Sequence, residues 1–237
     1  MDFNYTTMLA EFNIGSAHPG GFSATKRAWD LIQAYPHDII LDVGCGTGKT
    51  LAYLAETTSS QLFGIDNHKM MIEKAKQRLK TNRKIDLFLA DLTKLPFQSD
   101  TIDCLLSESV TSFADIAIGL KEYSRVLRKQ GILCLIEITA KEQLASEDRT
   151  EINQFYGTQS ILTKSEWEGA IHKAGFTIID RMPLPATSEG RVDLDMDMKI
   201  DPIYFDFLGH HFHLIEKLQN QIIGYLFLCQ KETVKAD

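Results

Sequence analysis

The sequence is poor in cysteine and has no excess of positive charge. The four cysteines are widely separated among 237 residues and form no C-x-x-C pair, so we expect reduced core thiols and no metal site. The formal net charge is −7, from 25 Lys and Arg against 32 Asp and Glu. Without a global positive field to neutralise phosphates, we expect no nucleic-acid partner.

Long apolar runs are also missing. No stretch approaches the roughly 18 apolar residues that a membrane span requires, and no apolar segment follows a basic one near residue 1. We therefore expect no membrane span and a cytoplasmic location. The length suits a single domain with elaborations, and we expect this domain to be a monomer or a homodimer.

Apolar runs alternate along the chain with segments of helical periodicity. The predicted strands cover residues 39–43, 62–66, 85–90, 101–106, 131–138, 176–182 and 222–229. The predicted helices cover residues 23–35, 49–56, 68–80, 115–128, 163–174 and 208–219, and residues 1–21 are expected to be irregular. Strands that are continuously apolar are typical of a parallel sheet covered by helices on both faces.

Residues that favour the start of a helix stand before or within the first turn of two of these predicted helices. Thr163 and Glu166 have the spacing of a capping box, and Gly175 is expected to end the helix that they open. Ser23 or Thr25 is expected to cap the helix that precedes the first strand.

Three alternating glycines, Gly44, Gly46 and Gly48, interrupt the chain where the first predicted strand ends. A turn without side chains lets the backbone approach a ligand, and the following helix would aim its free N–H groups at the same place. Ligands of open parallel sheets bind beyond the carboxyl ends of the strands, where Asp66 and Asp91 follow the next two strands. Asp66 stands at about the distance from the glycines at which a carboxylate accepts from ribose hydroxyls. A nucleotide-like cofactor is therefore expected.

The spacing of the glycines bears on which nucleotide binds. The segment GCGTG (44–48) lacks the G-x-G-x-x-G spacing, which weakens a dinucleotide-binding interpretation. Gly48, Lys49 and Thr50 imitate the end of a P-loop, but Val43 stands where that motif requires its first glycine. A P-loop-like nucleoside triphosphatase is kept as an alternative.

The segment LDVGCGTG (41–48) resembles the first motif of the class I S-adenosylmethionine-dependent methyltransferases. GID (64–66) is similar to the second motif of that family, and ADL (90–92) to the third. Residues 96–103 and 127–133 are similar to the small-molecule branch, which includes quinone-biosynthesis methyltransferases. The resemblance implies a Rossmann-like, doubly wound α/β fold, with a mostly parallel seven-stranded sheet whose last strand is antiparallel.

The resemblance extends over residues 39–139 and implies a set of cofactor contacts. The glycines would contact the methionine part of S-adenosylmethionine, Asp66 its ribose and Asp91 its adenine amino group, with Asp42 orienting the loop. The implied cofactor-binding residues are Asp42, Gly44, Cys45, Gly46, Gly48, Asp66, Asn67, Met71, Ala90, Asp91, Leu92 and Ser107, with His18 and Gly20 from the N-terminal segment.

The resemblance also suggests how one domain is organised. Residues 1–38 would form an N-terminal helix and a lid over the cofactor, and residues 39–183 the cofactor-binding core. Residues 184–221 would be a substrate-side insert, rich in aspartate and aromatic residues, and residues 222–231 the final strand.

Glu108 is the candidate catalytic residue, because Ser107-Glu108-Ser109 follows the fourth strand and faces the methyl position in the family pattern. It would orient or deprotonate an acceptor, or pair with the positively charged sulfur. Positioning alone can supply on the order of 7–11 kcal/mol, so methyl transfer has no strict need of a base. If Glu108 is the base, its replacement by glutamine lowers kcat far more than cofactor affinity.

Three histidines, His210, His211 and His213, raise the question of a metal site. No second cluster of ligands with suitable spacing accompanies them, so a solvated or partly buried helix end is favoured.

Together these features favour an enzyme that transfers a methyl group from S-adenosylmethionine to a small-molecule acceptor by in-line displacement, leaving S-adenosylhomocysteine. Two alternatives stay open at this point: the P-loop-like nucleoside triphosphatase, and a noncatalytic nucleotide-binding regulatory module.

Overall fold

A seven-stranded sheet forms the centre of the computed structural model, which describes residues 3–82, 84–186 and 200–233. The strands are β1 (Ile39–Val43), β2 (Gln61–Asp66), β3 (Ile85–Leu89), β4 (Ile102–Glu108), β5 (Leu127–Ala140), β6 (Phe176–Leu184) and β7 (Ile222–Lys231). Their order across the sheet is β3-β2-β1-β4-β5-β7-β6. Strands β1 to β5 pair in parallel, whereas β7 is antiparallel to both of its neighbours. The predicted fold class is confirmed.

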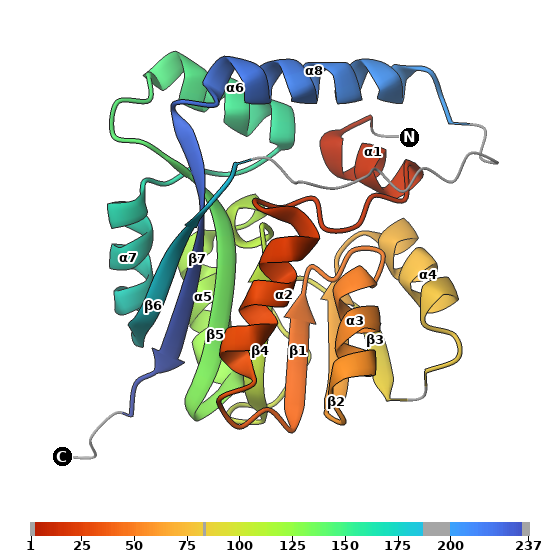
Figure 1. The fold of residues 1–237 in the computed structure, drawn as a ribbon, viewed down its shortest axis with the longest axis vertical. Coiled ribbons are helices and arrows are strands. Elements are labelled where there is room, and N and C mark those ends of the chain that lie inside the picture. The colour runs from red at the N-terminus through yellow and green to blue at the C-terminus, as the bar shows by residue number, and fades with distance from the viewer. Residues whose placement is uncertain (1–2, 83, 187–199, 234–237) are drawn as a thin grey trace.

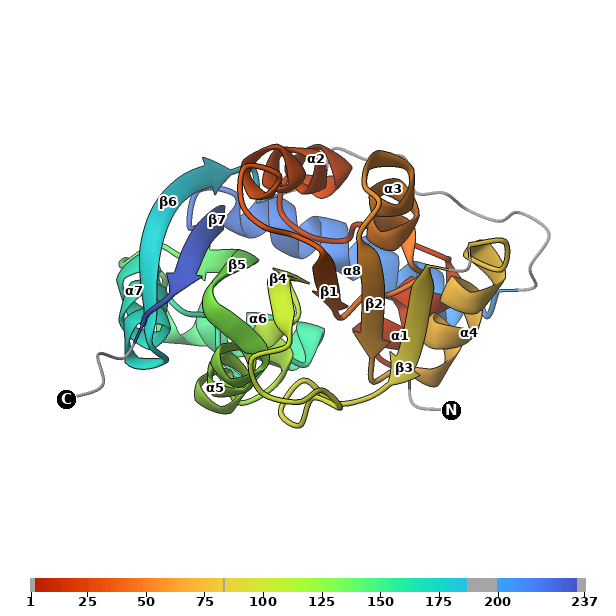
Figure 2. The same ribbon diagram turned by 90° about the horizontal axis from the view of Figure 1, so that it is seen from below.

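Helices cover both faces of this sheet (Figure 2). The helices α2 (Gly21–Ile32), α3 (Lys49–Thr57) and α4 (Lys69–Arg78) share one apolar core with the side chains of one sheet face. On the other face, α5 (Ile116–Val126) and α7 (Lys164–Lys173) bury Tyr123 and Trp167 in a second core. In the central strands β1, β4, β5 and β7, apolar side chains alternate between the two cores, so these strands are buried on both sides, which explains their continuous apolar sequence.

Three further helices lie beyond the carboxyl ends of the parallel strands and form what we call the cap (Figure 1). They are α1 (Tyr5–Glu11), α6 (Ser146–Tyr156) and α8 (Ile203–Leu218). The cap has its own apolar clusters, one of which joins Tyr5, Met8 and Phe12 of the N-terminal segment to Tyr204 of α8. It therefore roofs the edge of the sheet at which ligands of such folds bind.

The cap is where the sequence-based prediction of secondary structure was wrong. Residues 1–21 were expected to be irregular, but α1 forms there, with the Asn4 side chain accepting from the Thr7 N–H as its N-cap. Helix α6 was missed as well, and Ile152 is its single fully buried residue, so its periodicity is weak. Part of the predicted insert, residues 187–199, lies outside the described residues.

The predicted cap of α2 was also wrong. Gly20 is the N-cap, in a left-handed conformation with φ of 72° and without a side-chain bond, because the backbone turns there directly into the helix. Thr25 instead faces His18, with 3.2 Å between its hydroxyl and His18 Nε2. Ser23 is exposed on the surface of the helix.

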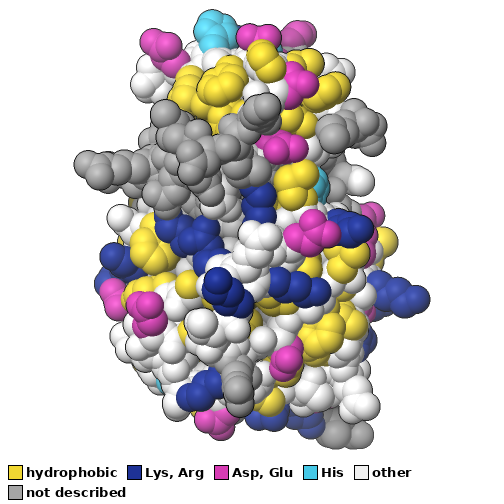
Figure 3. Space-filling view, turned by 90° about the vertical axis from the view of Figure 1, so that its right-hand side faces the viewer, with side chains coloured by type: hydrophobic (Ala, Val, Ile, Leu, Met, Phe, Trp, Pro, Cys, Tyr) yellow, Lys and Arg dark blue, Asp and Glu magenta, His cyan; other side chains and the backbone are white. Residues whose placement is uncertain are grey.

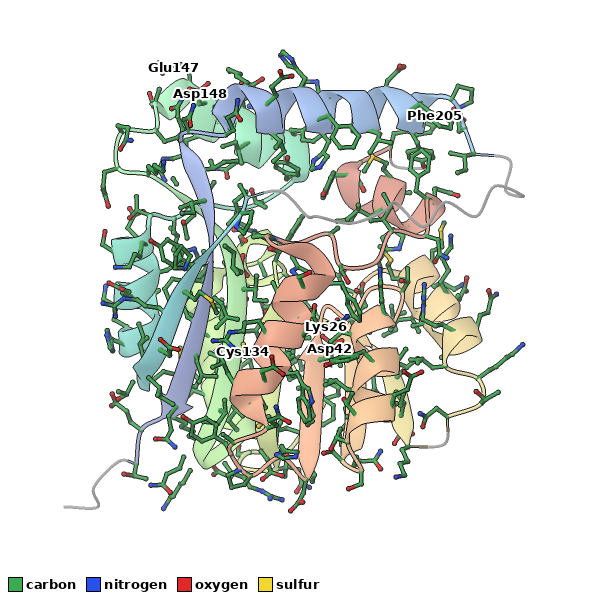
Figure 4. All side chains as sticks on the ribbon, in the orientation of Figure 1. Lys26, Asp42, Cys134, Glu147, Asp148 and Phe205 are labelled. Atoms are coloured by element: carbon green, nitrogen blue, oxygen red, sulfur yellow. The ribbon has the colours of Figure 1, made fainter. Side chains whose placement is uncertain are left out.

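The four cysteines are buried and free, among them Cys134 on β5 (Figure 4). Burial raises the pKa of the Cys104 thiol to about 12, so the thiol stays protonated and packs as a small apolar side chain. None of the helices in the described parts of the chain is long and apolar enough to cross a membrane.

The predicted capping box of α7 is confirmed. The Thr163 hydroxyl accepts from the Glu166 N–H at 3.2 Å, and the Glu166 carboxylate accepts from the Thr163 N–H at 2.7 Å.

Thr163→Ala is expected to lower the free energy of unfolding by about 1 kcal/mol, since an N–H of the first turn loses its partner. The midpoint of thermal unfolding measures this change. Ser23→Ala is the control, because that exposed hydroxyl caps no helix in the structure. Equal losses in the two variants would contradict the capping account.

Candidate active site

A cavity of about 710 Å³ lies between the carboxyl ends of the strands and the cap. Its lower part, which we call the sheet end, is lined by the residues that follow β1, β2, β3 and β4. Its upper part, the cap end, is lined by side chains of α1, α6 and α8 and by residues 158–161. The N-terminal segment 14–19 contributes to the wall as well. One cavity therefore joins both ends.

The glycine turn after β1 forms the floor of the sheet end. The N–H groups of Gly44 and Cys45 both donate to the Ile65 carbonyl, at 2.8 and 2.9 Å, which ties the turn to β2. Gly44 has φ of 72°, and a Cβ on it would lie 2.5 Å from Val110. Gly46 has φ of 52°, and the nearest atom to its Cβ position would be Met71 Sδ at 4.0 Å. A side chain at Gly46 would therefore project into space that a ligand can use.

Asp66 connects this turn to the next helix. Its Oδ2 accepts from the Gly46 N–H at 2.9 Å and its Oδ1 from the His68 N–H at 2.8 Å. Each oxygen keeps a second lone pair for a ligand hydroxyl. Burial raises the pKa of Asp66, and the two backbone hydrogen bonds oppose that rise.

Asp42 is the most deeply buried carboxyl group of the sheet end (Figure 4), with 2% of its surface exposed. Burial raises its pKa well above the ordinary range, and the nearby Glu108 and Asp66 raise it further. The same surroundings raise the pKa of the Cys45 thiol. Three acidic side chains in one buried place create a site that attracts positive charge.

Glu108, at the end of β4, is held by Thr50 and by His18, a predicted site residue whose contact with Glu108 the sequence did not indicate. Its Oε2 accepts from the Thr50 hydroxyl of α3 at 2.7 Å and lies 3.5 Å from His18 Nε2. His18 is 5% exposed, and through this contact the N-terminal segment closes over β4. The carboxylate thus sits between α3 and the N-terminal segment, on the side of the glycine turn.

Several buried polar atoms of the residues that line this region have no hydrogen-bond partner among the described residues. They include Oδ2 of Asp42, Oε1 of Glu108, Nδ1 of His68 and Oγ of Ser16, and all four residues line the cavity. Since buried polar groups are normally hydrogen-bonded, these atoms indicate a polar ligand. S-adenosylmethionine fits them, because its ammonium and sulfonium groups are cationic and its ribose and adenine offer donors for the carboxylates.

Most of the predicted site residues line this one cavity. Those that do are His18, Asp42, Gly44, Cys45, Gly46, Asp66, Asn67, Met71, Ala90, Asp91, Leu92 and Glu108. Asp91 is exposed, and its Oδ1 accepts from the N–H and the hydroxyl of Thr93, both at 2.7 Å. The structure thus brings together residues from four strand ends.

Three predicted cofactor contacts do not line the cavity and act beneath it. Gly48 is the N-cap of α3, and a Cβ on it would lie 2.9 Å from Leu79. Ser107 is fully buried, with its hydroxyl 2.9 Å from that of Thr111. Gly20 starts α2 and donates its N–H to the Pro185 carbonyl. In the structure these three residues support the surrounding backbone, and the expectation that they touch the cofactor stays a prediction.

The cap end is apolar and aromatic, with a few polar groups. The residues that α1, α6 and α8 contribute are Tyr5, Thr6, Met8, Leu9, Ile152, Tyr156, Leu208, His211, Phe212 and Ile215. Sequence reasoning passed over Tyr5 and Tyr156, because no local motif marks a residue that enters a site only through packing of distant helices. The ring distance of 4.7 Å between them could not be anticipated.

The three histidines of α8 have different surroundings and do not converge on one site. His210 stacks on Phe155 at a ring distance of 4.6 Å, and His211 turns into the cavity. His213 is exposed. Among the described residues no group of three or more His, Cys, Asp or Glu is arranged to hold a metal ion.

Known methyltransferases resemble this chain in sequence. A family model described as a methyltransferase domain matches residues 41–135. The uncharacterized methyltransferase YodH of Bacillus subtilis (strain 168) is 35% identical over 232 residues, which cover 96% of this chain and 99% of that protein. The chain belongs to the S-adenosylmethionine-dependent methyltransferases. The resemblance seen in the motifs of the sequence is thereby confirmed.

Solved structures show the same fold at low identity. Phosphoethanolamine N-methyltransferase 2 of Haemonchus contortus, with S-adenosylmethionine, has a TM-score of 0.79 at 17% identity, covering 97% of this chain and 58% of that one. Geranyl diphosphate C-methyltransferase of Streptomyces coelicolor A3(2), with S-adenosylhomocysteine, has a TM-score of 0.70 at 16% identity, covering 89% and 78%. This methyltransferase therefore shares its fold with proteins whose solved structures contain S-adenosylmethionine or S-adenosylhomocysteine.

The triphosphatase alternative is not supported. Its ligand carries several negative charges, whereas Asp42, Asp66 and Glu108 make the sheet end acidic. Lys49 is the sole Lys or Arg among the described residues that line the cavity.

Proposed function

We propose that this methyltransferase transfers a methyl group from S-adenosylmethionine to a small, uncharged acceptor bound at the cap end. The observation that carries the proposal is that one cavity joins the acidic sheet end to the apolar cap end. When bound, the cofactor supplies a methyl group on a positively charged sulfur. The protein holds the two partners in one chamber that the cap shields from water.

The sheet end would bind the cofactor through its carboxylates and its glycine turn. Asp66 would accept from the ribose hydroxyls, and Asp91 from the adenine amino group. Gly44 and Gly46 would leave room for the methionine part beside Asp42. Asn67 and Met71, at the start of α4, line the wall next to Asp66 and would flank the ribose and base.

We propose that Glu108 also serves cofactor binding. Its Oε2 is occupied by Thr50, and its unpartnered Oε1 lies in the same buried acidic group as that of Asp42. A cationic ligand would neutralise this group, which favours a contact with the ammonium group of the cofactor over removal of an acceptor proton.

Glu108→Gln is expected to weaken S-adenosylhomocysteine binding about tenfold, the value of roughly one hydrogen bond to a charged group. Isothermal titration calorimetry measures the affinity, and turnover is measured at saturating cofactor. A large loss of kcat with unchanged affinity would instead assign Glu108 as the general base.

Size and charge limit the acceptor to a small molecule. A cavity of about 710 Å³ has to hold both the cofactor and the acceptor. On the face in Figure 3, Lys and Arg side chains lie among Asp and Glu side chains, and the formal net charge of −7 supplies no global positive field for a nucleic acid. The structurally similar proteins are named for acceptors of this size, phosphoethanolamine and geranyl diphosphate.

We also propose that residues 1–38 and 184–221 serve the same site within one domain. Residues 14–19 cover the sheet end, and α8 supplies the roof of the cap end. Both segments thus act as parts of the cavity wall.

Methyl transfer itself tests the proposal and separates an enzyme from a noncatalytic module. The protein is incubated with S-adenosylmethionine carrying a deuterated methyl group and with a panel of phenols, amines and carboxylic acids. Mass spectrometry should show the labelled methyl group on an uncharged acceptor. Cofactor binding without transfer to any member of the panel would favour the noncatalytic module.

A further inference from the structure

Tyr156 and His211 form a hydrogen-bonded pair in the wall of the cap end. The Tyr156 hydroxyl lies 3.0 Å from His211 Nδ1, joining α6 to α8 across 55 positions of sequence. Both residues line the cavity. The Tyr5 ring packs edge-on against Tyr156 at 4.7 Å and lies 5.6 Å from His211, so α1 holds both rings in place.

The surroundings of this pair keep both side chains uncharged before a proton is transferred. Burial lowers the pKa of His211, so the imidazole is neutral at neutral pH and its bare nitrogen can accept a proton. Burial, with Tyr5 as a smaller cause, raises the pKa of Tyr156, so the tyrosine does not ionise by itself. Among the described residues, α1, α6 and α8 contribute no Lys, Arg, Asp or Glu to the cavity wall.

We infer that Tyr156 and His211 are a catalytic pair that removes the proton from a hydroxyl group of the acceptor. The inference rests on the proposed function, because it concerns the same cavity. It goes further by naming the proton acceptor and the class of acceptor molecule, a ring hydroxyl such as a phenol or an enol.

The proton and the electrons of this step balance within the pair and its partners. The acceptor hydroxyl gives its proton to the Tyr156 oxygen, and the Tyr156 proton passes to Nδ1 of His211. The acceptor oxygen forms a bond to the methyl carbon as the carbon–sulfur bond breaks, and the electron pair stays on sulfur. The products are a methyl ether, S-adenosylhomocysteine and a protonated His211.

The chemistry of the cap end favours a ring hydroxyl over other acceptors. An acidic acceptor such as a carboxylate or phosphate would need a cation, and the cap helices supply none among the described residues. A neutral amine has a free lone pair and needs no base before it attacks. The Tyr5, Tyr156 and Phe212 rings at this end of the cavity offer faces and edges for an aromatic ring.

A coloured phenol tests the pair without turnover. The complex of the protein with S-adenosylhomocysteine is titrated with 4-nitrophenol at a pH at which the free phenol is mainly protonated. We expect the absorption band of the phenolate to grow on binding, because the pair takes up the proton. Tyr156→Phe and His211→Asn should both abolish this growth.

Tyr204→Phe and His210→Asn are matched controls. Tyr204 and His210 lie on the same helix, α8, but do not line the cavity, so both variants should keep the phenolate band. In turnover with a phenol, Tyr156→Phe should lower kcat about 100-fold or more, the usual contribution of a general base.

The outcomes separate this inference from the proposed function. Failure of the wild-type protein to bind S-adenosylhomocysteine in calorimetry would overturn the proposed function. Normal cofactor binding without a phenolate band, or with a band that survives in both Tyr156→Phe and His211→Asn, would overturn the pair alone. Thermal unfolding of each variant shows whether a lost band reflects a lost fold, and Tyr156→Phe, which keeps the ring, decides if His211→Asn unfolds.

Discussion

Asp66→Ala is expected to weaken S-adenosylhomocysteine binding at least about 100-fold. A hydrogen bond to a charged group contributes roughly 1.5–3 kcal/mol, and a ribose offers two hydroxyls to this carboxylate. The substitution also frees the Gly46 and His68 N–H groups, which Asp66 holds at 2.9 and 2.8 Å. The glycine turn therefore loses its link to α4 together with the ribose contact. Isothermal titration calorimetry of the wild-type protein and the variant measures the difference.

Asp86→Ala provides the matched control for this prediction. Asp86 lies on the neighbouring strand β3, where its carboxylate is exposed and accepts from the Gln61 side chain at 3.0 Å. It does not line the cavity, so its removal should leave cofactor affinity unchanged. An Asp66→Ala variant that binds S-adenosylhomocysteine as tightly as Asp86→Ala would remove the ribose role from Asp66.

Between about pH 5 and pH 8, the free energy of unfolding of the wild-type protein is expected to fall by about 2–3 kcal/mol more than that of the Glu137→Gln variant. Glu137 is fully buried on β5 and accepts from the Thr111 N–H at 2.9 Å and the Ser112 hydroxyl at 2.6 Å. Burial raises its pKa from 4.5 to about 7, although these hydrogen bonds oppose the rise.

The sign follows from which state holds the proton. Between about pH 4.5 and pH 7 the folded protein keeps Glu137 protonated while the unfolded chain does not. The stability from this proton is fully present below pH 4.5 and is lost as the pH rises through 7. A glutamine cannot ionise, and its amide can accept from Thr111 and donate to Ser112, so the variant should lack this loss.

Urea unfolding at the two pH values measures the effect. Glu147→Gln is the control, because Glu147 is an exposed carboxylate in the first turn of α6 (Figure 4). Its variant should keep the pH dependence of the wild-type protein. A Glu137→Gln variant with that same dependence would show that Glu137 is ionised in the folded protein throughout this range.

The sheet end could be predicted because its signals are local. A glycine such as Gly44 is needed where φ is 72° and a Cβ would meet Val110, and a carboxylate such as Asp66 stands at the end of a half-buried strand. Such features depend on a few neighbouring residues and on the order of the strands. The same holds for the capping box at Thr163, which the structure contains as the sequence suggests.

The cap end could not be predicted because its contacts are between distant segments. Tyr156 and His211 are 55 positions apart, and Thr50 and Glu108 are 58 apart, with no motif that relates them. Helix α1 has seven residues, too few for a clear helical period, and it is stabilised by packing against Tyr204 of α8. The acceptor side of the site therefore emerges only once the chain is folded.

A crystal structure of the protein with S-adenosylhomocysteine tests the central claim most directly. The account predicts the ribose hydroxyls within hydrogen-bond distance of Asp66, the ammonium group beside Asp42 and Glu108, and the sulfur facing the cap end with Tyr156 and His211. A ligand bound outside this cavity, or one whose sulfur faces away from the cap end, would contradict it.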